Sequence, residues 1–429
     1  MKTYPMKYGT EEISVTVPEK NLLGVIKSHG DHIKKSEEQV ILDALQDPIE
    51  SPRLKEIISP GDTICIVISD ITRAWQKMGF YLPYLVEELN QAGIEDKDIV
   101  FLCATGSHRG QTQEEHGVLL GEKLSKRFQV IDHDCRAEDN MVYVGTTTFG
   151  TPVKINKVAM ECDHILLTGA VVYHDLAGWG GGKKSILPGI SAYESIMANH
   201  SLSLNPVVGK GLNPKVRCGN ALDNPLHLDM VEAAVFVKPS FLLNVIMDDE
   251  GNIGKAVAGH YLKAHEAGQK LIEEMDGVSI SEKADLVISS AGGYPKDIEL
   301  YQSSKALINA KGAAKLGGSI ILLSQCIEGF GHDEVEEIIV NYNSNQEREA
   351  ALRENYTVAK YTGYLISEIA AAYNVVLVSQ MPPKSLEKIN IPIVATLEEA
   401  LEIVYAKKGM DLQTYLIPYG ANTLPKMNE

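Results

Sequence analysis

The stretch from Tyr173 to Gly189, which reads YHDLAGWGGGKKSILPG, holds the residues of this chain that are best suited to chemistry. His174 stands where an apolar, strand-like run ends, and Lys184 follows ten residues later, directly after Lys183. Between them lie three consecutive glycines, Gly180, Gly181 and Gly182. Because glycine has no side chain, a ligand could approach this backbone closely, while the lysines could hold a phosphate or an electrophile. A glycine-rich surface turn with solvated lysines is the alternative interpretation.

This stretch matches neither of the two common phosphate-binding loops. A P-loop would need a glycine where Ala177 stands and a serine or threonine where Lys184 stands. The dinucleotide-binding fingerprint, if it began at Gly178, would need its third glycine at Lys183. The stretch is therefore interpreted as a ligand-binding loop of another kind.

Two other apolar, β-branched runs, residues 63–68 and 99–104, also end in charged groups. Those groups are Asp70 and Arg73 after the first run, and His108 and Arg109 after the second. Continuous apolar runs are typical of strands that are buried on both faces of a parallel sheet. Ligands bind at the carboxyl ends of the strands in such sheets, so we predict that these groups share a pocket with the glycine-rich stretch. Taken singly, each arginine could be merely solvated and each histidine structural.

A short helix is predicted after the glycine-rich stretch, over residues 192–199. Ser191 and Glu194 have the spacing of a capping box at its start. His200 then falls at the end of the helix, where the helix dipole favours an imidazolium ion. A histidine that only caps the helix is the alternative. Residues 203–227 are rich in Gly, Asn and Pro and are predicted to form a long loop, and a strand is predicted over 241–247.

The remaining chain predicts a second α/β unit, because apolar runs again alternate with helical segments. Strands are expected at 285–289, 319–324, 375–379 and 389–394, and helices at 301–315, 333–341, 346–372 and 396–406. We predict an α/β protein of two domains with largely parallel sheets, residues 1–275 and 276–429, and an active site in the cleft between them.

Composition narrows the class of protein. The 429 residues carry 40 Lys and Arg against 57 Asp and Glu, a formal charge of −17, which disfavours nucleic acid as a partner. No apolar run approaches the roughly 20 residues needed to span a membrane. The N-terminal sequence MKTYP lacks the apolar core of a signal peptide, and the six cysteines form no Cys-x-x-Cys pair. A cytoplasmic protein with reduced thiols is expected.

Taken together, five motifs in order along nearly the whole chain resemble the lactate racemase (LarA) family of nickel-pincer enzymes. They are Ser-Asp-x-Thr-Arg at 69–73, Gly-Ser-His-Arg at 106–109, the stretch at 173–189, Asn-His at 199–200 and Tyr-Gln-x-x-Lys at 301–305. The resemblance implies a racemase or epimerase that inverts C2 of a 2-hydroxy acid. It also implies a nickel-pincer nucleotide, pyridinium-3-thioamide-5-thiocarboxylic acid mononucleotide nickel, which is joined to a lysine through one of its sulfur-containing arms.

The resemblance also assigns roles to residues of this chain. The tether is Lys184, favoured over Lys183 by its spacing from His174, and the nickel ligand is His200. The proton-transferring residues are His108 and His174. The other implied residues are Arg73 for the substrate carboxylate, Asp70 to orient its neighbours, Gly180, Gly181 and Gly182 beside the cofactor, and Tyr301, Gln302 and Lys305 from the second domain. Tyr356 is a possible counterpart of a family aromatic residue. The partners implied are a small anionic 2-hydroxy acid and, transiently, the cofactor-biosynthesis proteins.

The chemistry suits these residue types. The Cα–H of an ionised hydroxy acid is a very poor acid, whereas hydride loss to a pyridinium-type acceptor gives a 2-keto acid without a carbanion. A histidine can take the hydroxyl proton near neutral pH, and inversion requires one such base for each enantiomer. Two other classes stay open: a metal lyase or hydrolase that uses the histidines on zinc, although no His-Glu-x-x-His spacing occurs, and a non-catalytic nickel- or nucleotide-binding protein. The identity of the acid and the oligomeric state do not follow from the sequence.

Overall fold

The computed structural model describes residues 2–27, 35–248 and 250–427. The chain forms two compact units. The Gly-loop unit comprises residues 30–203 and 214–275, and the C-terminal unit comprises residues 1–29, 204–213 and 276–429. The predicted boundary at 275/276 coincides with the last passage of the chain from one unit to the other. The division differs for residues 1–29 and 204–213, which we had placed in the N-terminal domain and which belong to the C-terminal unit.

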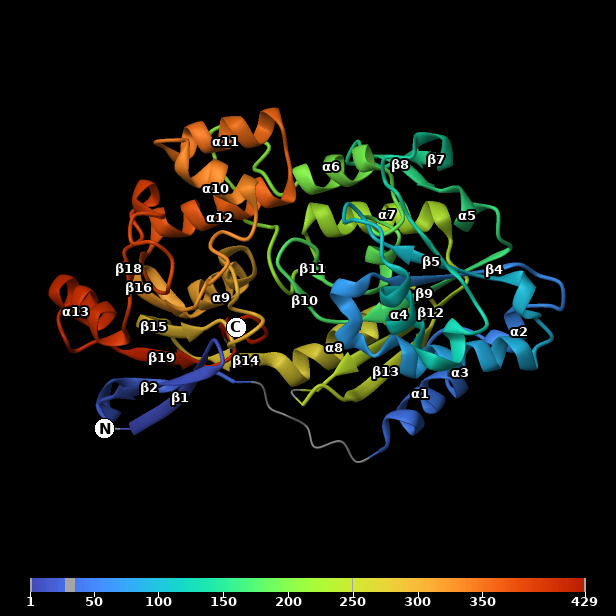
Figure 1. Ribbon diagram of the computed structural model, residues 1–429, viewed down its shortest axis with the longest axis horizontal. Helices are drawn as coiled ribbons and strands as arrows, with labels where there is room; N and C mark the ends of the chain where they lie inside the picture. Colours follow the sequence, from blue (N-terminus) through green and yellow to red (C-terminus); the bar gives the residue numbers. More distant parts are fainter. Residues whose placement is uncertain (1, 28–34, 249, 428–429) are drawn as a thin grey trace. The chain divides into compact units, whose positions relative to one another are not determined.

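The Gly-loop unit is built on a six-stranded sheet in the order β13-β12-β9-β4-β5-β6, in which only β13 is antiparallel to its neighbour (Figure 1). The strands are β4 (Ile64–Ser69), β5 (Ile99–Ala104), β6 (Val130–Asp132), β9 (His164–Ala170), β12 (Phe241–Met247) and β13 (Ile253–Gly259). The predicted strands at 63–68, 99–104, 164–170 and 241–247 are confirmed. Their middle residues are fully buried, as expected of parallel strands that are covered on both faces.

Three helices, α1 (Glu37–Gln46), α3 (Met78–Gln91) and α4 (Gln113–Ser125), share one apolar core with one face of this sheet. Ser36 accepts a hydrogen bond from the amide of Gln39 and so caps α1. The other elements of this unit are α2 (Leu54–Ile57), β7 (Met141–Thr146), β8 (Pro152–Asn156), α5 (Lys157–Met160), β10 (Tyr173–His174), β11 (Gly178–Trp179), α6 (Tyr193–Ser201), α7 (Pro225–Val237) and α8 (Lys263–Asp276), with short 3-10 turns η2 (Ile71–Gln76), η3 (Asp96–Asp98), η4 (Glu138–Asn140) and η5 (Gly182–Ser185).

Two predictions near the glycine-rich stretch require correction. The N-cap residue of α6 is Ala192 rather than Ser191, and it provides no side-chain cap; the hydroxyl of Ser191 instead donates to the carbonyl of Ile186. The predicted loop over 203–227 ends early, because α7 begins at Pro225. Asn224 caps α7 by accepting from two backbone amides, and proline is favoured at the first helical position.

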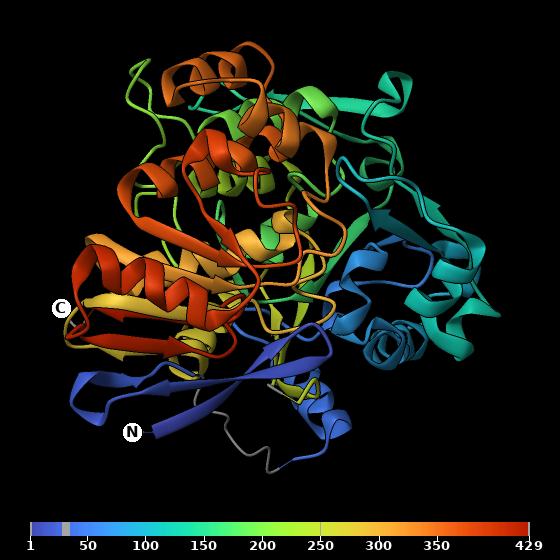
Figure 2. The same cartoon turned by 60° about the vertical axis from the view of Figure 1, so that its left-hand side comes forward.

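The C-terminal unit contains a second six-stranded sheet, all parallel, in the order β18-β17-β16-β15-β19-β3. Figure 2 shows the hairpin of β1 (Lys2–Tyr8) and β2 (Glu11–Val17) lying beside this sheet. Apolar side chains of the hairpin and of α13 (Leu397–Lys408) form one core with the sheet. Because β3 (Leu22–Val25) also pairs with β19 (Thr414–Ile417), the first residues of the chain belong to this unit. That long-range pairing could not be read from local patterns.

Helices α9 (Leu300–Ala313) and α12 (Val358–Ala372) pack against each other and against the strands of this sheet. The single helix predicted over 346–372 is wrong, because this segment forms two helices, α11 (Asn345–Glu354) and α12. Thr357 lies between them and caps α12. The other elements are η1 (Glu19–Asn21), β14 (Gly277–Ile280), β15 (Ala284–Ser290), β16 (Ala314–Leu323), α10 (Asp333–Val340), β17 (Asn374–Val378), η6 (Glu387–Ile389), β18 (Ile393–Val394) and β20 (Leu424–Met427). In the described parts of both units, no helix is long and apolar enough to cross a membrane.

Candidate active site

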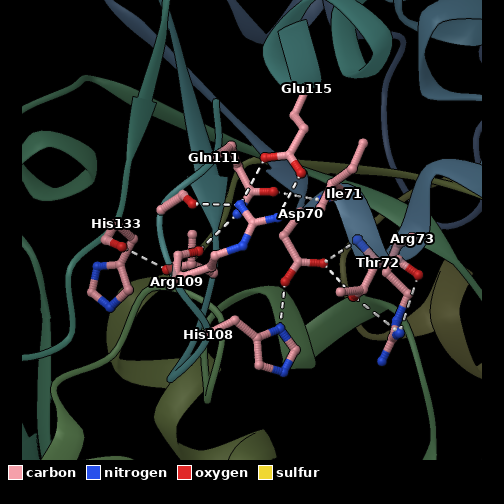
Figure 3. A network of polar contacts seen from close by, with 11 residues as sticks. Asp70, Ile71, Thr72, Arg73, His108, Arg109, Gln111, Glu115 and His133 are labelled. Carbon is pink, nitrogen blue, oxygen red and sulfur yellow. Dashed lines mark hydrogen bonds and ion pairs between the residues drawn. The ribbon is translucent and has the colours of Figure 1, made fainter. Parts of the chain in front are cut away.

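The exits of β4 and β5 bring Asp70 and His108 together (Figure 3). Asp70 caps the 3-10 turn η2: its Oδ1 accepts from the amide of Thr72 at 3.1 Å and from the hydroxyl of Thr72 at 2.5 Å. Its Oδ2 lies 2.5 Å from Nδ1 of His108. Burial works to raise the pKa of Asp70, but the bonds to His108 and Thr72, with the charges of His108 and Arg73, outweigh it and lower the pKa. Asp70 is therefore a carboxylate that fixes the ring of His108, with Nε2 left to face solvent or a ligand.

The two arginines of these tips have different surroundings. Arg109 makes two hydrogen bonds to the carboxylate of Glu115, at 2.8 and 2.6 Å, and Figure 3 shows its guanidinium turned toward that residue. Among the described residues, Arg73 donates only to Thr72, to the hydroxyl at 3.2 Å and the carbonyl at 3.4 Å. Gln111 connects the two tips, because its Oε1 accepts from the amide of Ile71. Of the two guanidinium groups, that of Arg109 is bound to a carboxylate of the chain and that of Arg73 is not.

The glycines of the 173–189 stretch are required by the packing of the protein itself. Gly181 and Gly182 have φ angles of +73° and +55°. A Cβ on Gly181 would lie 2.6 Å from the carbonyl oxygen of Ala170 and from Oδ1 of Asn244, and one on Gly182 would lie 2.6 Å from the ring of His265. In the folded protein, these glycines make room for Ala170, Asn244 and His265. Contact of Gly180, Gly181 and Gly182 with a cofactor stays a prediction.

His174 and Lys184 are in direct contact across this stretch. Nε2 of His174 lies 2.9 Å from Nζ of Lys184, and its Nδ1 lies 3.2 Å from the amides of Leu176 and Ala177. Oδ1 of Asp175 lies 3.1 Å from the same Nδ1. The two amides stabilise a neutral ring that accepts at Nδ1, whereas the carboxylate stabilises a ring that carries a proton there. The surroundings of His174 therefore support both of the protonation states that a general acid and base must adopt.

Lys184 has the electrostatic properties of a nucleophilic amine. Burial and then the positive charge of Arg73 lower the pKa of Lys184 to about 7, against the opposing effect of Asp175. Near neutral pH a large share of the amine is therefore unprotonated, which is the form that attacks an electrophile. Arg73, which comes from the tip of β4, thus acts on a lysine of the glycine-rich stretch.

His200 lies in the last turn of α6, is buried, and donates from Nδ1 to the carbonyl of Ile196 at 2.9 Å. The expectation that the helix dipole would favour an imidazolium ion at this position is wrong. Burial, followed by the charge of Lys184, lowers the pKa of His200 to about 3 and outweighs the helix terminus. A neutral imidazole whose Nδ1 proton is held by a carbonyl presents the lone pair of Nε2, as a metal ligand must.

A residue that the sequence did not reveal positions α6. The buried carboxylate of Asp229 on α7 accepts from Asn199, next to His200, at 2.7 Å. It also accepts from Thr147 at 2.5 Å and Thr151 at 2.8 Å. The predicted loop over 203–227 covers the start of α7, and the sequence gives no prediction for residues 228–240, so the inward face of α7 could not be predicted. The Asn224-Pro225 pair, a capping residue followed by proline, is the signal that could have revealed it.

The predicted residues of the Gly-loop unit therefore form one connected group. His108 contacts Asp70, Arg73 acts on both Asp70 and Lys184, and Lys184 contacts His174 and acts on His200. In the C-terminal unit, Tyr301, Gln302 and Lys305 lie in the first two turns of α9, where Nζ of Lys305 donates to Oε1 of Gln302 at 2.8 Å. Tyr356 is buried between α11 and α12, with its ring 6.1 Å from that of Tyr361.

A cavity of about 520 Å³ in the C-terminal unit does not include any of the predicted site residues. Its walls are Tyr8, Ser379, Gln380, Met381, Pro383, Ile393, Val394 and Ala395. The lining carries no charged side chain that could hold a carboxylate. This cavity therefore does not identify the site, and the connected charged group of the Gly-loop unit is the better candidate.

Comparison with known proteins is consistent with this geometry. Residues 8–211 match the lactate racemase N-terminal domain, and residues 279–424 match the lactate racemase C-terminal domain. A lactate racemase from Thermoanaerobacterium thermosaccharolyticum is 36% identical over 333 residues, which cover 77% of this chain and 76% of that protein. The chain belongs to the lactate racemase family. It is an isomerase of the racemase type, as the sequence predicts.

Two further relatives extend the match over the whole chain. A lactate racemase from Lactiplantibacillus plantarum is 31% identical over 434 residues, which cover 99% of this chain and 100% of that protein. The structure of a lactate racemase apoprotein from Thermoanaerobacterium thermosaccharolyticum superposes with a TM-score of 0.90 at 31% identity, covering 99% of this chain and 100% of the other. A Thermotoga maritima protein of 18% identity and TM-score 0.65 shares the fold. The prediction of two α/β domains with mainly parallel sheets is confirmed.

Proposed function

We propose that this protein is a 2-hydroxy-acid racemase or epimerase that uses a nickel-pincer nucleotide tethered to Lys184, with lactate or a related acid as substrate. The observation that carries the proposal is the position of Lys184. Its amine has a pKa near 7, lies 2.9 Å from His174 and interacts electrostatically with Arg73 and His200. Lys184, the proposed tether, thus interacts with the proposed base His174, the proposed carboxylate-binding group Arg73 and the proposed metal ligand His200.

The residues of this region fit the group that the family implies. Lys184 would hold the pincer nucleotide covalently, and Nε2 of His200 would be the protein's ligand to nickel. Among the residues that the structure describes, no group of three or more His, Cys, Asp or Glu side chains is placed to hold a metal. The nickel implied by the family would need only one ligand from the protein, because sulfur and carbon atoms of the nucleotide would supply the others. When bound, this group supplies a hydride acceptor, so that the substrate passes through a 2-keto acid.

Residues of the chain would bind the substrate and transfer its hydroxyl proton. Arg73 would bind the carboxylate by a planar, two-point contact. Nε2 of His108, whose ring is fixed by Asp70, would take the hydroxyl proton of one enantiomer. His174, whose surroundings support both of its protonation states, would do the same for the other enantiomer. Inversion requires one proton-transferring group for each enantiomer, and His108 and His174, which follow different strands, would supply them. Contributions of Tyr301, Gln302 and Lys305 from the C-terminal unit belong to the same proposal.

The decisive experiment produces the wild type and Lys184→Ala together with cofactor-biosynthesis proteins. Wild type is expected to show a covalent adduct by intact mass, about one nickel per chain and racemisation of a 2-hydroxy acid with retention of a Cα deuterium label. Lys184→Ala is expected to lose all three, while a control at the exposed Lys157 keeps them. Wash-out of the deuterium into solvent would contradict hydride transfer, and turnover that depends on zinc would favour a zinc lyase or hydrolase.

A further inference from the structure

Lys183, the neighbour of the proposed tether, is an amine buried without a partner. The residue is 1% exposed, and its Nζ has no hydrogen-bond partner among the described residues. Removing an amine from water without a compensating hydrogen bond is costly, and more so if it is charged. Lys183 is therefore a residue at which the folded apoprotein is less stable than it could be.

The surroundings of Lys183 offer it no negative charge. The titratable groups that interact with it electrostatically are Lys184, His227 and His265. Both histidines are committed elsewhere: Nδ1 of His227 donates to the carbonyl of Ala177 at 3.0 Å, and Nε2 of His265 donates to the carbonyl of Gly180 at 2.8 Å. Burial, assisted by the charge of Lys184, lowers the pKa of Lys183 to about 7. Among the described residues, Asp175 acts on Lys184, but no carboxylate acts on Lys183.

A structural role explains this arrangement poorly. The stretch around Lys183 is fixed by other contacts, since Asn244 accepts from the amide of Gly182 and His265 covers Gly182. A methionine would fill a similar volume without an unsatisfied amine, and removal of such a group is often neutral or stabilising. Groups kept at a cost in stability are typical of binding and catalytic sites.

We propose that Lys183 is a second cofactor-binding group, which pairs as an ammonium ion with an anionic group of the pyridinium mononucleotide while Lys184 forms the covalent bond. The inference depends on the proposed function and adds a residue to it. The two lysines would have complementary states: Lys184 must lose its proton to act as a nucleophile, and Lys183 must keep one to bind an anion. An incoming anion therefore favours the proton on Lys183 and leaves Lys184 neutral.

The test compares the wild type, Lys183→Met and a control, Lys123→Met, at an exposed position of α4. Apoprotein is titrated calorimetrically with nicotinate mononucleotide, a pyridinium mononucleotide that carries a phosphate and a ring carboxylate. Loss of one charge-assisted hydrogen bond should weaken binding to Lys183→Met by about tenfold or more, with no change in the control. Nicotinamide mononucleotide, which lacks the ring carboxylate, then distinguishes the anions: a retained difference identifies the phosphate, and a lost difference the carboxylate.

Two more measurements separate folding from binding. The apoprotein of Lys183→Met is expected to melt at a higher temperature than wild type, and after coexpression with cofactor-biosynthesis proteins it is expected to carry at least tenfold less Lys184 adduct by mass. Equal affinity of both proteins for nicotinate mononucleotide, no binding by either, equal loading, or a lower melting temperature of the variant would overturn the inference. Failure of the wild type to load would instead contradict the proposed function.

Discussion

The two parts of the candidate site differ in how far the protein neutralises its own charges. At the tips of β4 and β5, most charged groups are paired within the chain, Asp70 with His108 and Arg109 with Glu115. Arg73 is the exception, because among the described residues it donates only to Thr72. In the glycine-rich stretch, the buried Lys183 and the partly buried Lys184 have pKa values lowered to about 7, and neither makes an ion pair among the described residues. Apart from Arg73, the first part is complete without a ligand, and the second is not.

Under the proposed function, this difference separates the part that would receive the cofactor from the part that would hold the base His108 in place. A base must be fixed before the substrate arrives, because catalysis gains from groups that need no rearrangement. A region that takes up a large anionic group gains instead from charges that have no partner until that group binds. Each prediction below tests one side of this contrast.

The largest effect is expected on the paired side, from Asp70→Asn. An amide cannot stabilise a protonated His108, and it can present a donor to Nδ1 and so favour the wrong tautomer. We expect kcat of the loaded enzyme to fall roughly 100-fold or more, a typical value for a lost general base. Nickel content should stay equal to that of the wild type, because Asp70 contacts neither lysine. Asp139→Asn, at an exposed position, is the matched control. A variant that loads much less nickel, but whose loaded fraction turns over normally, would reverse the assignment of the two parts.

Much of this contrast was within reach of the sequence. The runs ending at residues 69, 104 and 170 are apolar and β-branched, which predicts buried parallel strands, and parallel strands must bring their carboxyl ends to one edge. Asp70, His108 and His174 could therefore be placed at the site from local pattern alone. The motifs then allowed Lys184 and His200 to be added through the family resemblance.

The remainder depends on contacts between distant residues. The pKa of His200 is decided by burial and by Lys184, not by the end of its own helix, so a local rule about helix dipoles predicted the wrong charge. The glycines pack against Asn244 and His265, which lie more than 60 residues further along the chain. Asp229 could not be identified because no helix is predicted over residues 225–237, where α7 lies. The membership of residues 1–29 in the C-terminal unit follows from the pairing of β3 with β19, which no local spacing encodes.

A moderate effect, on the unpaired side, is expected in the pH dependence of stability. The pKa of Lys183 is about 7 in the folded protein and about 10.4 in an unfolded chain. Between these values the unfolded state binds more protons, so this residue makes the apoprotein more stable as pH rises from about 7 to 10. One group contributes at most about 1.4 kcal/mol per pH unit.

This expectation is checked by denaturant unfolding of wild type and Lys183→Met at several pH values, with their free energies of unfolding compared at each pH. The free energy of unfolding of Lys183→Met should exceed that of wild type most at pH 7, and the two should converge toward pH 10. The control Lys123→Met should follow the wild type throughout. Parallel curves for Lys183→Met and wild type would show that Lys183 is charged, and therefore paired, in the apoprotein.

The smallest effect is expected from Arg109→Gln, although Arg109 adjoins His108 in the sequence. Its guanidinium is largely exposed and is held by Glu115, and exposed ion pairs contribute little to stability. His108 is fixed by Asp70 from another strand end, so the loss of Arg109 should leave its ring in place. We expect kcat/KM of the loaded enzyme to stay within about twofold of wild type and to lose its small difference in high salt, which screens exposed charges. A tenfold loss of kcat/KM would mean that Arg109 leaves Glu115 to bind substrate. The ion pair of Arg109 would then be a resting arrangement that the substrate replaces.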